Sequence, residues 1–285
     1  MLDIFKKAQE NKYAVGAFNV SNLEQIKAIF LAAQNLKSPI IISASEGEAE
    51  FIGKKHLRAI IDSYKKETGV EVILHQDHGK SFETIKDSID AGYDSVQFDG
   101  SKLSFEENVE ETKRIVEYAR SKGVKNVEAE FNHLEGQSAL IEKIELKKEN
   151  FTDPSQAKDF VERTGVDALA VVIGNLHGVF KDCQNPKLDI DRLKEIREAV
   201  GQDVNLILHG GSGIAEDDIK EAVKNGIVKI NVNTELRMAY TNSLKKTLED
   251  NPDQNTPYKI MPLVVEAVQK VVEDKIKLFG SNNQI

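Results

Sequence analysis

The chain has 285 residues, of which 40% are hydrophobic and 30% are charged, and its formal net charge is −9. This composition is enough for a sizeable core, and the acidic charge argues against nucleic-acid binding, which needs a basic face. No segment is apolar enough to span a bilayer, and the N-terminus lacks the apolar stretch of a signal peptide. The single cysteine, Cys183, excludes an internal disulfide framework. We therefore expect a cytoplasmic protein without membrane or nucleic-acid partners.

Strand-like apolar runs alternate with helix-like segments along the whole chain. The intervening segments have apolar residues three and four positions apart, as in amphipathic helices. Ser21 with Glu24 and Ser104 with Glu107 predict capping boxes, and Asp153-Pro154 predicts a helix start. The expected strands are 13–18, 39–44, 70–75, 94–98, 124–130, 167–173, 204–208 and 227–232.

Eight strands, each followed by a helical segment, predict an α/β fold of the (β/α)8 TIM barrel type. The near-continuous apolar runs are typical of a parallel sheet that is covered on both faces. No linker-like composition divides residues 1–285, so we expect a single domain. The longest irregular segment, 131–152, follows strand five, and loops of that length in compact domains are often functional.

Polar or ionisable residues occur at the end of every predicted strand. In TIM barrels the active site is built at these C-terminal ends, so the pattern predicts an enzyme. The residues concerned are Asn19, Ser45, Asp77 with His78, Asp99, Glu130, His177, His209, and Asn231 with Asn233.

Three of these residues, His78, His177 and His209, are histidines followed by glycine. Three imidazoles at equivalent barrel positions predict a catalytic Zn²⁺ site with an open position. Asp77 precedes one presumed ligand and is a candidate for proton transfer. Glu130 alternates with Glu128, so both should point into the barrel, where a metal would supply the partner that a buried carboxylate needs.

A glycine-rich turn after strand seven predicts a binding site for a substrate phosphate. Gly210-Gly211-Ser212 leads into a helix near Glu216, and Asn233-Thr234 ends strand eight. Barrel phosphate sites favour the loops after these two strands. Lys181 is either a further positive charge at this site or a solvated loop residue.

With these motifs identified, the chain resembles the class II, metal-dependent ketose-bisphosphate aldolases. The resemblance extends from Ala14 to Ser281. Its most specific segments are His75-Gln76-Asp77-His78-Gly79, Asp99-Gly100-Ser101, Ile173-Gly174-Asn175-Leu176-His177-Gly178-Val179, His209-Gly210-Gly211-Ser212-Gly213 and Lys229-Ile230-Asn231-Val232-Asn233-Thr234.

The resemblance implies a role for each matching residue. His78, His177 and His209 would hold Zn²⁺, Glu130 would serve an alternative metal position, and Asp77 would handle the proton of the C4 hydroxyl. Asn231 would contact the ketone portion of the substrate. Binding of dihydroxyacetone phosphate and of a monovalent cation, Na⁺ or K⁺, would fall to Gly178, Lys181, Gly210, Ser212, Asn233 and Thr234. We also expect a homodimer or homotetramer.

The chemistry of aldol cleavage agrees with a metal. Breaking the C3–C4 bond of a ketose leaves an enediolate, whose negative charge a Lewis acid stabilises. The alternative is a Schiff base on a desolvated lysine. We expect no strand lysine in such an environment, because Lys229, although flanked by Val228 and Ile230, is not at its strand end.

One segment departs from the family pattern. The mobile loop of the family usually reads Gly-x-x-Gly-Gly and then two acidic residues, one of which exchanges the C3 proton. Here Asn132 and Glu135 replace two glycines, and Ser138 and Ala139 occupy the acidic positions. Either Glu135, the first candidate, or Glu142 takes this role, or the proton step is impaired or different.

Several functions remain open at this point. The leading hypothesis is cleavage of fructose 1,6-bisphosphate to dihydroxyacetone phosphate and glyceraldehyde 3-phosphate, which Asn233 favours weakly. Tagatose 1,6-bisphosphate or a phosphorylated deoxy-keto acid are alternative substrates. A non-catalytic sugar-phosphate binding protein would explain Ser138, but the presence of Asp77 argues against it.

Overall fold

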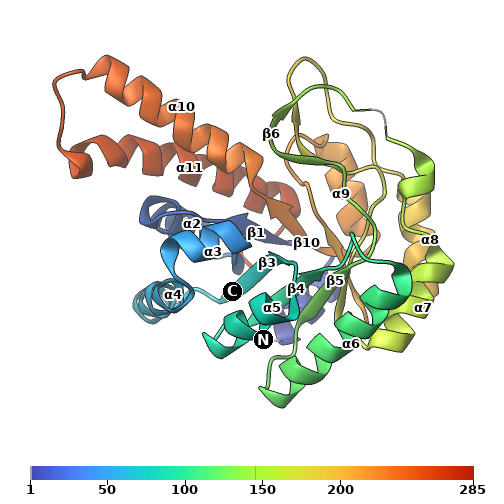
Figure 1. Ribbon diagram of the computed structural model, residues 1–285. Helices are drawn as coiled ribbons and strands as arrows, with labels where there is room; N and C mark the ends of the chain where they lie inside the picture. Colours follow the sequence, from blue (N-terminus) through green and yellow to red (C-terminus); the bar gives the residue numbers. More distant parts are fainter. Residues whose placement is uncertain (1, 145) are drawn as a thin grey trace.

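The computed structural model describes residues 2–144 and 146–285. In this part of the chain, eight parallel strands close into a barrel in the order β1-β10-β9-β7-β5-β4-β3-β2 (Figure 1). The predicted (β/α)8 barrel is therefore confirmed. Its strands are β1 (Val15–Asn19), β2 (Ile40–Ala44), β3 (Val72–Gly79), β4 (Ser95–Asp99), β5 (Val127–Glu130), β7 (Ala168–Ala170), β9 (Asn205–Leu208) and β10 (Ile227–Val232).

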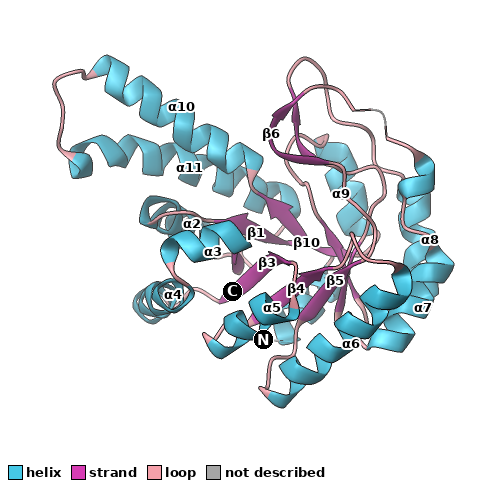
Figure 2. Cartoon of the chain, viewed as in Figure 1, coloured by secondary structure: helices cyan, strands magenta, loops and turns pink. Residues whose placement is uncertain are grey.

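Helices follow every barrel strand and pack around the outside of the barrel (Figure 2). After β10, two long helices form a hairpin that projects from the barrel, and α11 returns to pack beside α2 (Figure 1). Within the described ranges, no helix has the length and apolar character needed to cross a membrane. The helices are α1 (Leu2–Asn11), α2 (Leu23–Leu36), α3 (Glu46–Ile52), α4 (Lys54–Thr68), α5 (Phe82–Asp90), α6 (Phe105–Ser121), the 3-10 turn η1 (Lys148–Asn150), α7 (Pro154–Thr164), α8 (Ile190–Val200), α9 (Glu216–Lys224), α10 (Thr234–Asp250) and α11 (Pro257–Phe279).

Two of the three predicted helix starts are confirmed. Ser104 forms a capping box with Glu107, and the side chain of Asp153 caps α7. The prediction for Ser21 and Glu24 was one residue early, because Asn22 is the N-cap of α2 and accepts a hydrogen bond from the Gln25 backbone at 3.0 Å. Gln25 in turn accepts from the Ser21 backbone at 2.8 Å, so an Asn–Gln pair satisfies the free N–H groups instead of a Ser–Glu pair.

The barrel interior is apolar at its N-terminal end. Side chains such as Val15 and Ala17 from β1 pack there against residues of the other strands, and α1 contributes Ile4 and Phe5 to the same cluster. The outer faces of the strands pack against the surrounding helices in a separate, larger cluster. Because α1 fills the N-terminal end, the polar side chains of the interior gather towards the C-terminal end.

Strand β3 extends beyond the predicted 70–75, and its end is irregular. Its pairing with β4 shifts register between Gln76 and Gly79, and His78 has a left-handed backbone with φ of 48°. Successive residues of a regular strand point to opposite faces, and a bulge changes this direction. Consequently Asp77 and His78, although adjacent, both line the cavity at the barrel mouth. A non-glycine residue in this conformation is strained, as is common at functional sites.

The segment 131–152 is not irregular throughout, contrary to the prediction. Part of it forms β6 (Gly136–Ile141), which pairs in parallel with β8 (His177–Phe180) in a two-stranded sheet beside the barrel mouth (Figure 1). Gly136 is the register partner of His177, a predicted metal ligand. Most of β6 is at least partly exposed, so it lacks the buried alternation that would have identified it from sequence.

A candidate metal centre at the open end of the barrel

A cavity of about 290 Å³ lies at the C-terminal end of the barrel. It collects most of the residues selected from the strand ends, which come from segments far apart in the chain. The predicted site residues that line it are Asn19, Ser45, Asp77, His78, Glu130, His177, Gly178, His209, Gly210, Ser212, Asn231, Asn233 and Thr234. Within the described ranges, Gly211, Lys181 and Glu135 are the predicted site residues that do not line it.

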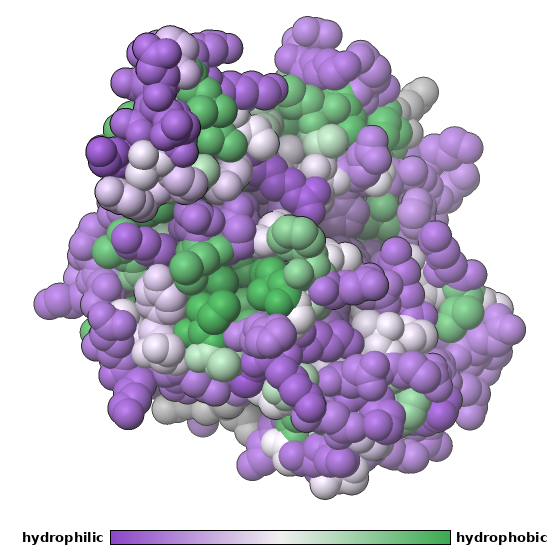
Figure 3. All heavy atoms as spheres, turned by 60° about the vertical axis from the view of Figure 1, so that its left-hand side comes forward, coloured by the Kyte–Doolittle hydropathy of each residue, from purple (hydrophilic) through white to green (hydrophobic). Residues whose placement is uncertain are grey.

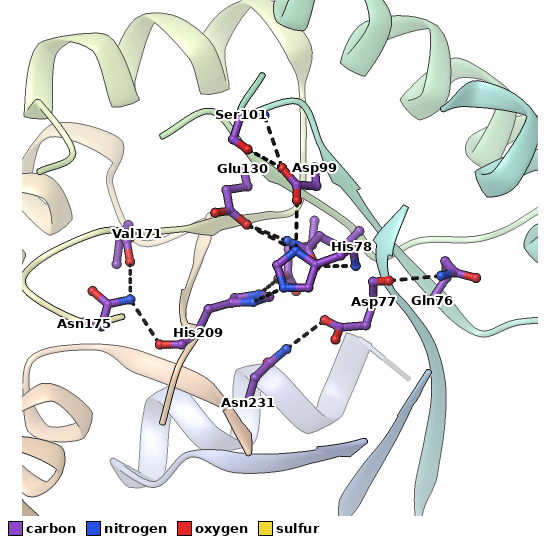
Figure 4. A network of polar contacts seen from close by, with 12 residues as sticks. Gln76, Asp77, His78, Asp99, Ser101, Glu130, Val171, Asn175, His209 and Asn231 are labelled. Atoms are coloured by element: carbon purple, nitrogen blue, oxygen red, sulfur yellow. Dashed lines mark hydrogen bonds and ion pairs between the residues drawn. The ribbon is translucent and has the colours of Figure 1, made fainter. Parts of the chain in front are cut away.

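Carboxylates determine how the rings of His78 and His209 face the cavity, and Figure 4 shows Asp99 beside the His78 ring. The Nδ1 atom of His78 lies 3.0 Å from Asp99 Oδ2, and the Nε2 atom of His209 lies 2.7 Å from Glu128 Oε1. Ionised carboxylates only accept hydrogen bonds, so these two ring nitrogens carry the protons. The other nitrogen of each ring, His78 Nε2 and His209 Nδ1, therefore faces the cavity. His209 Nδ1 presents a lone pair, and His78 Nε2 presents one when a metal displaces its proton.

These two nitrogens face one another at 3.2 Å. Two acceptors this close repel each other unless a proton or a cation lies between them. A tetrahedral Zn²⁺, with Zn–N distances of about 2.0–2.1 Å, separates two nitrogen ligands by about 3.3–3.4 Å. The spacing of the two imidazoles therefore fits a shared zinc ion.

His177 completes the group from the start of β8. Its ring centroid lies 5.0 Å from that of His78 and 6.2 Å from that of His209. One nitrogen from each of the three histidines lies within 4.8 Å of the others. His78, Asp99 and Glu130 form a second group with the same spacing, so Glu130 is placed where a second metal position would be.

The electrostatics of the cavity favour positive charge at its centre. Burial lowers the pKa of His177 to about 3 and also lowers that of His209, so both rings are neutral, as ligands must be. Burial opposes charge on His78 as well, but the carboxylates of Asp77, Asp99 and Glu130 outweigh it and raise its pKa to about 10. The same carboxylates would stabilise a metal cation.

Asp77 is buried yet ionised. Burial alone would raise its pKa, but the positive charges of His78 and Lys229 hold that pKa well below the usual range. Its two oxygens accept hydrogen bonds from the Nδ2 atoms of Asn19 and Asn231, both at 2.9 Å. A carboxylate fixed in this way beside the histidines is available to accept a proton.

Unpartnered groups in the cavity indicate that it binds a polar ligand. Within the described residues, Asn231 Oδ1 and Asn233 Oδ1 are buried and have no hydrogen-bond partner. Buried acceptors of this kind are costly unless a donor such as a hydroxyl group reaches them. Both side chains come from the C-terminal end of β10, where the substrate was predicted to bind.

Some backbone N–H groups of the predicted phosphate-binding turn donate hydrogen bonds to other parts of the protein. The backbone of Gly211 donates to Asn231 O at 2.8 Å, and that of Gly213 donates to Glu235 Oε1 at 2.9 Å. No acceptor in the described residues takes the N–H of Gly210 or Ser212, and both of these residues line the cavity. Asn185, which sequence reasoning missed, ties this turn to β8 through Gly178 O at 2.9 Å and Ser212 O at 3.0 Å.

The expectation that no strand lysine is desolvated was wrong. Lys229 lies in β10 with a relative exposure of 1%, and its Nζ atom donates to Glu128 Oε2 at 2.6 Å. Glu128, likewise predicted to point inwards, therefore has a lysine and His209 as partners rather than a metal. Lys229 precedes Asn231 by two residues on the same strand face, which is the signal that would have placed it inside the barrel. It does not line the cavity and its ammonium is paired with Glu128, so it is poorly placed to form a Schiff base with a substrate there.

The loop residues predicted to supply an acid lie outside the cavity. Glu142 forms an exposed ion pair with Lys181 at 2.7 Å, and the Glu135 carboxylate lies 3.9 Å from His133 Nε2. His133, which precedes Glu135 by two residues in the same loop, does line the cavity. Arg237 of α10, which also lines it, was missed; its guanidinium pairs with Glu48 at 2.7 Å.

Comparison with known proteins agrees with this geometry. The family model described as "Fructose-bisphosphate aldolase class-II" matches residues 1–284. The chain belongs to this family. Among curated relatives, "Fructose-bisphosphate aldolase" of Thermus caldophilus is 39% identical, with 98% of this chain and 97% of the relative covered. "Probable fructose-bisphosphate aldolase" of Bacillus subtilis (strain 168) is also 39% identical, with 100% and 98% covered.

A solved structure of another aldolase shows the same fold. The crystal structure of the YdjI aldolase from Escherichia coli K12 matches with a TM-score of 0.85 and 37% sequence identity. The match covers 99% of this chain and 97% of that one. The resemblance noted in the sequence is therefore confirmed at the level of the aldolase family.

Proposed function

We propose that this class II aldolase family member catalyses the reversible, Zn²⁺-dependent cleavage of fructose 1,6-bisphosphate to dihydroxyacetone phosphate and glyceraldehyde 3-phosphate. The proposal depends mainly on one observation. His78 Nε2 and His209 Nδ1 face one another at 3.2 Å, with a nitrogen of His177 close by and the ionised Asp77 beside them. That arrangement combines a zinc-binding triad with a group that can move a proton.

His78, His177 and His209 hold the metal in this proposal, and Glu130 with Asp99 serves a second position. When bound, Zn²⁺ supplies a Lewis acid that stabilises negative charge on the substrate oxygens. The histidines do not act alone in this site, because Asp99 accepts a hydrogen bond from His78 and Glu128 accepts one from His209, and these contacts orient the two rings. Such outer partners raise the basicity of a histidine ligand and fix its ring.

Asp77 accepts the proton of the C4 hydroxyl when the C3–C4 bond breaks and returns it in the reverse reaction. Its position is supported by the amides of Asn19 and Asn231, which donate to its two oxygens and prevent rotation. Asn231 keeps its own Oδ1 atom free for a substrate hydroxyl. A fixed, ionised carboxylate that needs no reorganisation suits general base catalysis.

The phosphate of dihydroxyacetone phosphate binds at Gly210 and Ser212, with Gly178, Asn233 and Thr234 completing this corner and a Na⁺ or K⁺ ion nearby. The free backbone N–H groups of Gly210 and Ser212 support this assignment. The N–H of Gly211 donates to Asn231 O, so Gly211 stabilises the turn and does not bind the phosphate through this group. Lys181 contributes only if it leaves Glu142, with which it pairs at the surface.

We assign the aldehyde end of the substrate to the part of the cavity that Ser45 and Arg237 line. The guanidinium of Arg237 would bind the phosphate at this end of the substrate, and the phosphate would replace Glu48 as its partner. A tagatose bisphosphate or another phosphorylated ketose differs from fructose bisphosphate in this half of the molecule, and these remain the alternative substrates. A coupled assay for dihydroxyacetone phosphate, run on each ketose with and without a chelator, tests the reaction and its metal requirement together.

A non-catalytic sugar-phosphate binding protein is the second candidate, favoured by Ser138 at the position of the missing loop acid. That assay separates the two, because a binding protein would retain affinity for dihydroxyacetone phosphate without producing it. The ionised and oriented state of Asp77 supports an enzyme.

We further propose that the protein works in the cytoplasm as a homodimer or homotetramer. Apolar atoms reach the surface on the face shown in Figure 3. Among the exposed apolar residues, Phe51 is 80% exposed, while Tyr258 and Leu263 on α11 are 75% and 51% exposed. Exposed apolar side chains of this size support an interface between copies. Light scattering after size-exclusion chromatography gives the number of subunits.

A further inference from the structure

We propose that Glu128 and Lys229 act as positioning residues that select the protonation tautomer of His209. This inference depends on the zinc site of the proposed function. Glu128 would hold the His209 proton on Nε2, so that Nδ1 is free to bind metal, and Lys229 would hold Glu128 in the orientation that this requires. Neither residue lines the cavity, so both would act through His209 rather than on the substrate.

Glu128 connects the lysine to the metal ligand from the middle of the barrel. It is 1% exposed, and its Oε1 atom lies 2.7 Å from His209 Nε2 while Oε2 lies 2.6 Å from Lys229 Nζ. A carboxylate can only accept in both contacts. His209 must therefore carry its proton on Nε2, on the side away from His78.

Lys229 continues the same pattern of donors and acceptors towards β3 and β4. Its Nζ atom also lies 3.0 Å from His75 Nε2, which must accept, so His75 carries its proton on Nδ1 and donates to Ser95 Oγ at 2.8 Å. The Ser95 hydroxyl donates in turn to Asn126 O at 3.1 Å. The position of each proton in this series of hydrogen bonds is thus assigned, and the series ends at the lone pair of His209 Nδ1.

Stability alone does not account for this arrangement. Removing two charges from water is expensive, and well-packed apolar residues often replace a buried ion pair at no cost or with a gain. The other half of the barrel interior is apolar, with residues such as Ile207 and Val228. An ion pair placed directly behind a metal ligand is therefore better explained by its effect on that ligand.

The proposal predicts opposite effects for two related variants. In Glu128→Gln, the amide oxygen must face the ammonium of Lys229, so the NH₂ group faces His209 Nε2 and donates to it. The His209 proton then moves to Nδ1 and blocks the metal. In the double variant with Lys229→Met the amide is free to turn, and its oxygen again accepts from Nε2–H. A second mutation should therefore restore what the first one removes.

Two measurements test this prediction. Nitrogen NMR of ¹⁵N-histidine-labelled, zinc-free protein reports which nitrogen of His209 carries the proton, and chelator competition gives the zinc affinity. We expect Glu128→Gln to shift the proton to Nδ1 and to weaken zinc binding by about 10- to 100-fold, the usual effect of removing such a partner. The double variant should return the proton to Nε2 and recover most of the affinity.

Asp94→Asn is the matched control. It breaks a partly buried ion pair with Arg58, at 2.9 Å, at the other end of the barrel, so it should lower thermal stability and leave zinc affinity unchanged. If Glu128→Gln keeps the Nε2 proton and the parental zinc affinity, or if the double variant binds zinc more weakly than Glu128→Gln, the proposal is wrong. If the single variant does not fold, the charge-neutral double variant decides by comparison with the parent: a His209 proton on Nδ1, or a zinc affinity more than about 10-fold below that of the parent, would overturn the proposal. A parent that binds no zinc would overturn the proposed function, while its His209 tautomer would still decide this inference.

Discussion

His78 Nε2 and His209 Nδ1 lie 3.2 Å apart, close enough to share a proton or a metal cation. Asp99 and Glu128 impose this arrangement from behind by accepting the protons of the opposite ring nitrogens. The carboxylates therefore prepare a place for positive charge between the two rings. Zinc binding, rather than a structural role of the histidines, is the simplest use of such a place.

The first prediction concerns the metal ligands. Alanine at His78, His177 or His209 removes one of three protein ligands, so each variant should lose stoichiometric zinc and aldol cleavage together. Metal content by atomic absorption, measured beside activity, checks this. His56, an exposed histidine on α4, provides the control, and His56→Ala should retain both properties. Full zinc and activity in all three ligand variants would contradict the assignment.

The second prediction concerns proton transfer. Asp77→Ala should lower kcat by roughly 10²-fold or more, because general acid–base groups act in the transition state. KM should change much less, since Asn19 and Asn231 remain to contact the substrate. Steady-state kinetics on zinc-loaded protein provide the test, with zinc content as the control. A near-parental kcat would remove Asp77 from the mechanism.

The third prediction places the substrate phosphate. Sulfate or phosphate soaked into crystals should bind at the N–H groups of Gly210 and Ser212, which no described acceptor engages. Thr234→Val should weaken competitive inhibition by inorganic phosphate if its hydroxyl contributes to this corner. An anion found only elsewhere in the cavity would count against the phosphate assignment.

The fourth prediction concerns the loop and the C3 proton. Exchange of the C3 hydrogen of dihydroxyacetone phosphate with solvent deuterium should fall in Glu135→Gln if loop closure brings this carboxylate to the site. Glu142→Gln should have a smaller effect, because Glu142 pairs with Lys181 at the surface. His133→Asn belongs in the same series, since His133 already lines the cavity. Parental exchange rates in the Glu135 and Glu142 double variant would assign the step to another group.

The fifth prediction concerns the pairing of β6 with β8 at His177, the proposed metal ligand. Gly136 has φ of 95°, and a Cβ atom there would lie 2.1 Å from His177 O, so Gly136→Ala should separate the strands and lower kcat. Gly123→Ala is the control, because Gly123 has φ of 78° but open space around it. Both alanines should cost about 1–2 kcal/mol of backbone strain, whereas activity should fall only in Gly136→Ala. Equal kinetics in the two variants would show that the pairing is dispensable.

The sequence by itself determined the barrel and most of the cavity. Alternating strand and helix periods are local properties, and parallel strands connected by helices bring their C-terminal ends to one edge. For that reason the adjacent Asp77 and His78 could be assigned to one site with His177 and His209, which lie far from them in the chain. Residues at strand ends could be assigned to the site without knowing which side chains they contact.

Only the tertiary structure decided which buried residues contact the histidines and which strand pairs beside the site. The Lys229–Glu128 pair is stable in the barrel because each charge meets the other across it, and a desolvated lysine is disfavoured when its own strand alone is considered. Similarly, β6 exists because β8 offers it hydrogen bonds, while its own residues carry no strand period. Interactions between distant segments leave little trace in local periodicity, so the partners of His209 and His177 emerged only when the chain was folded.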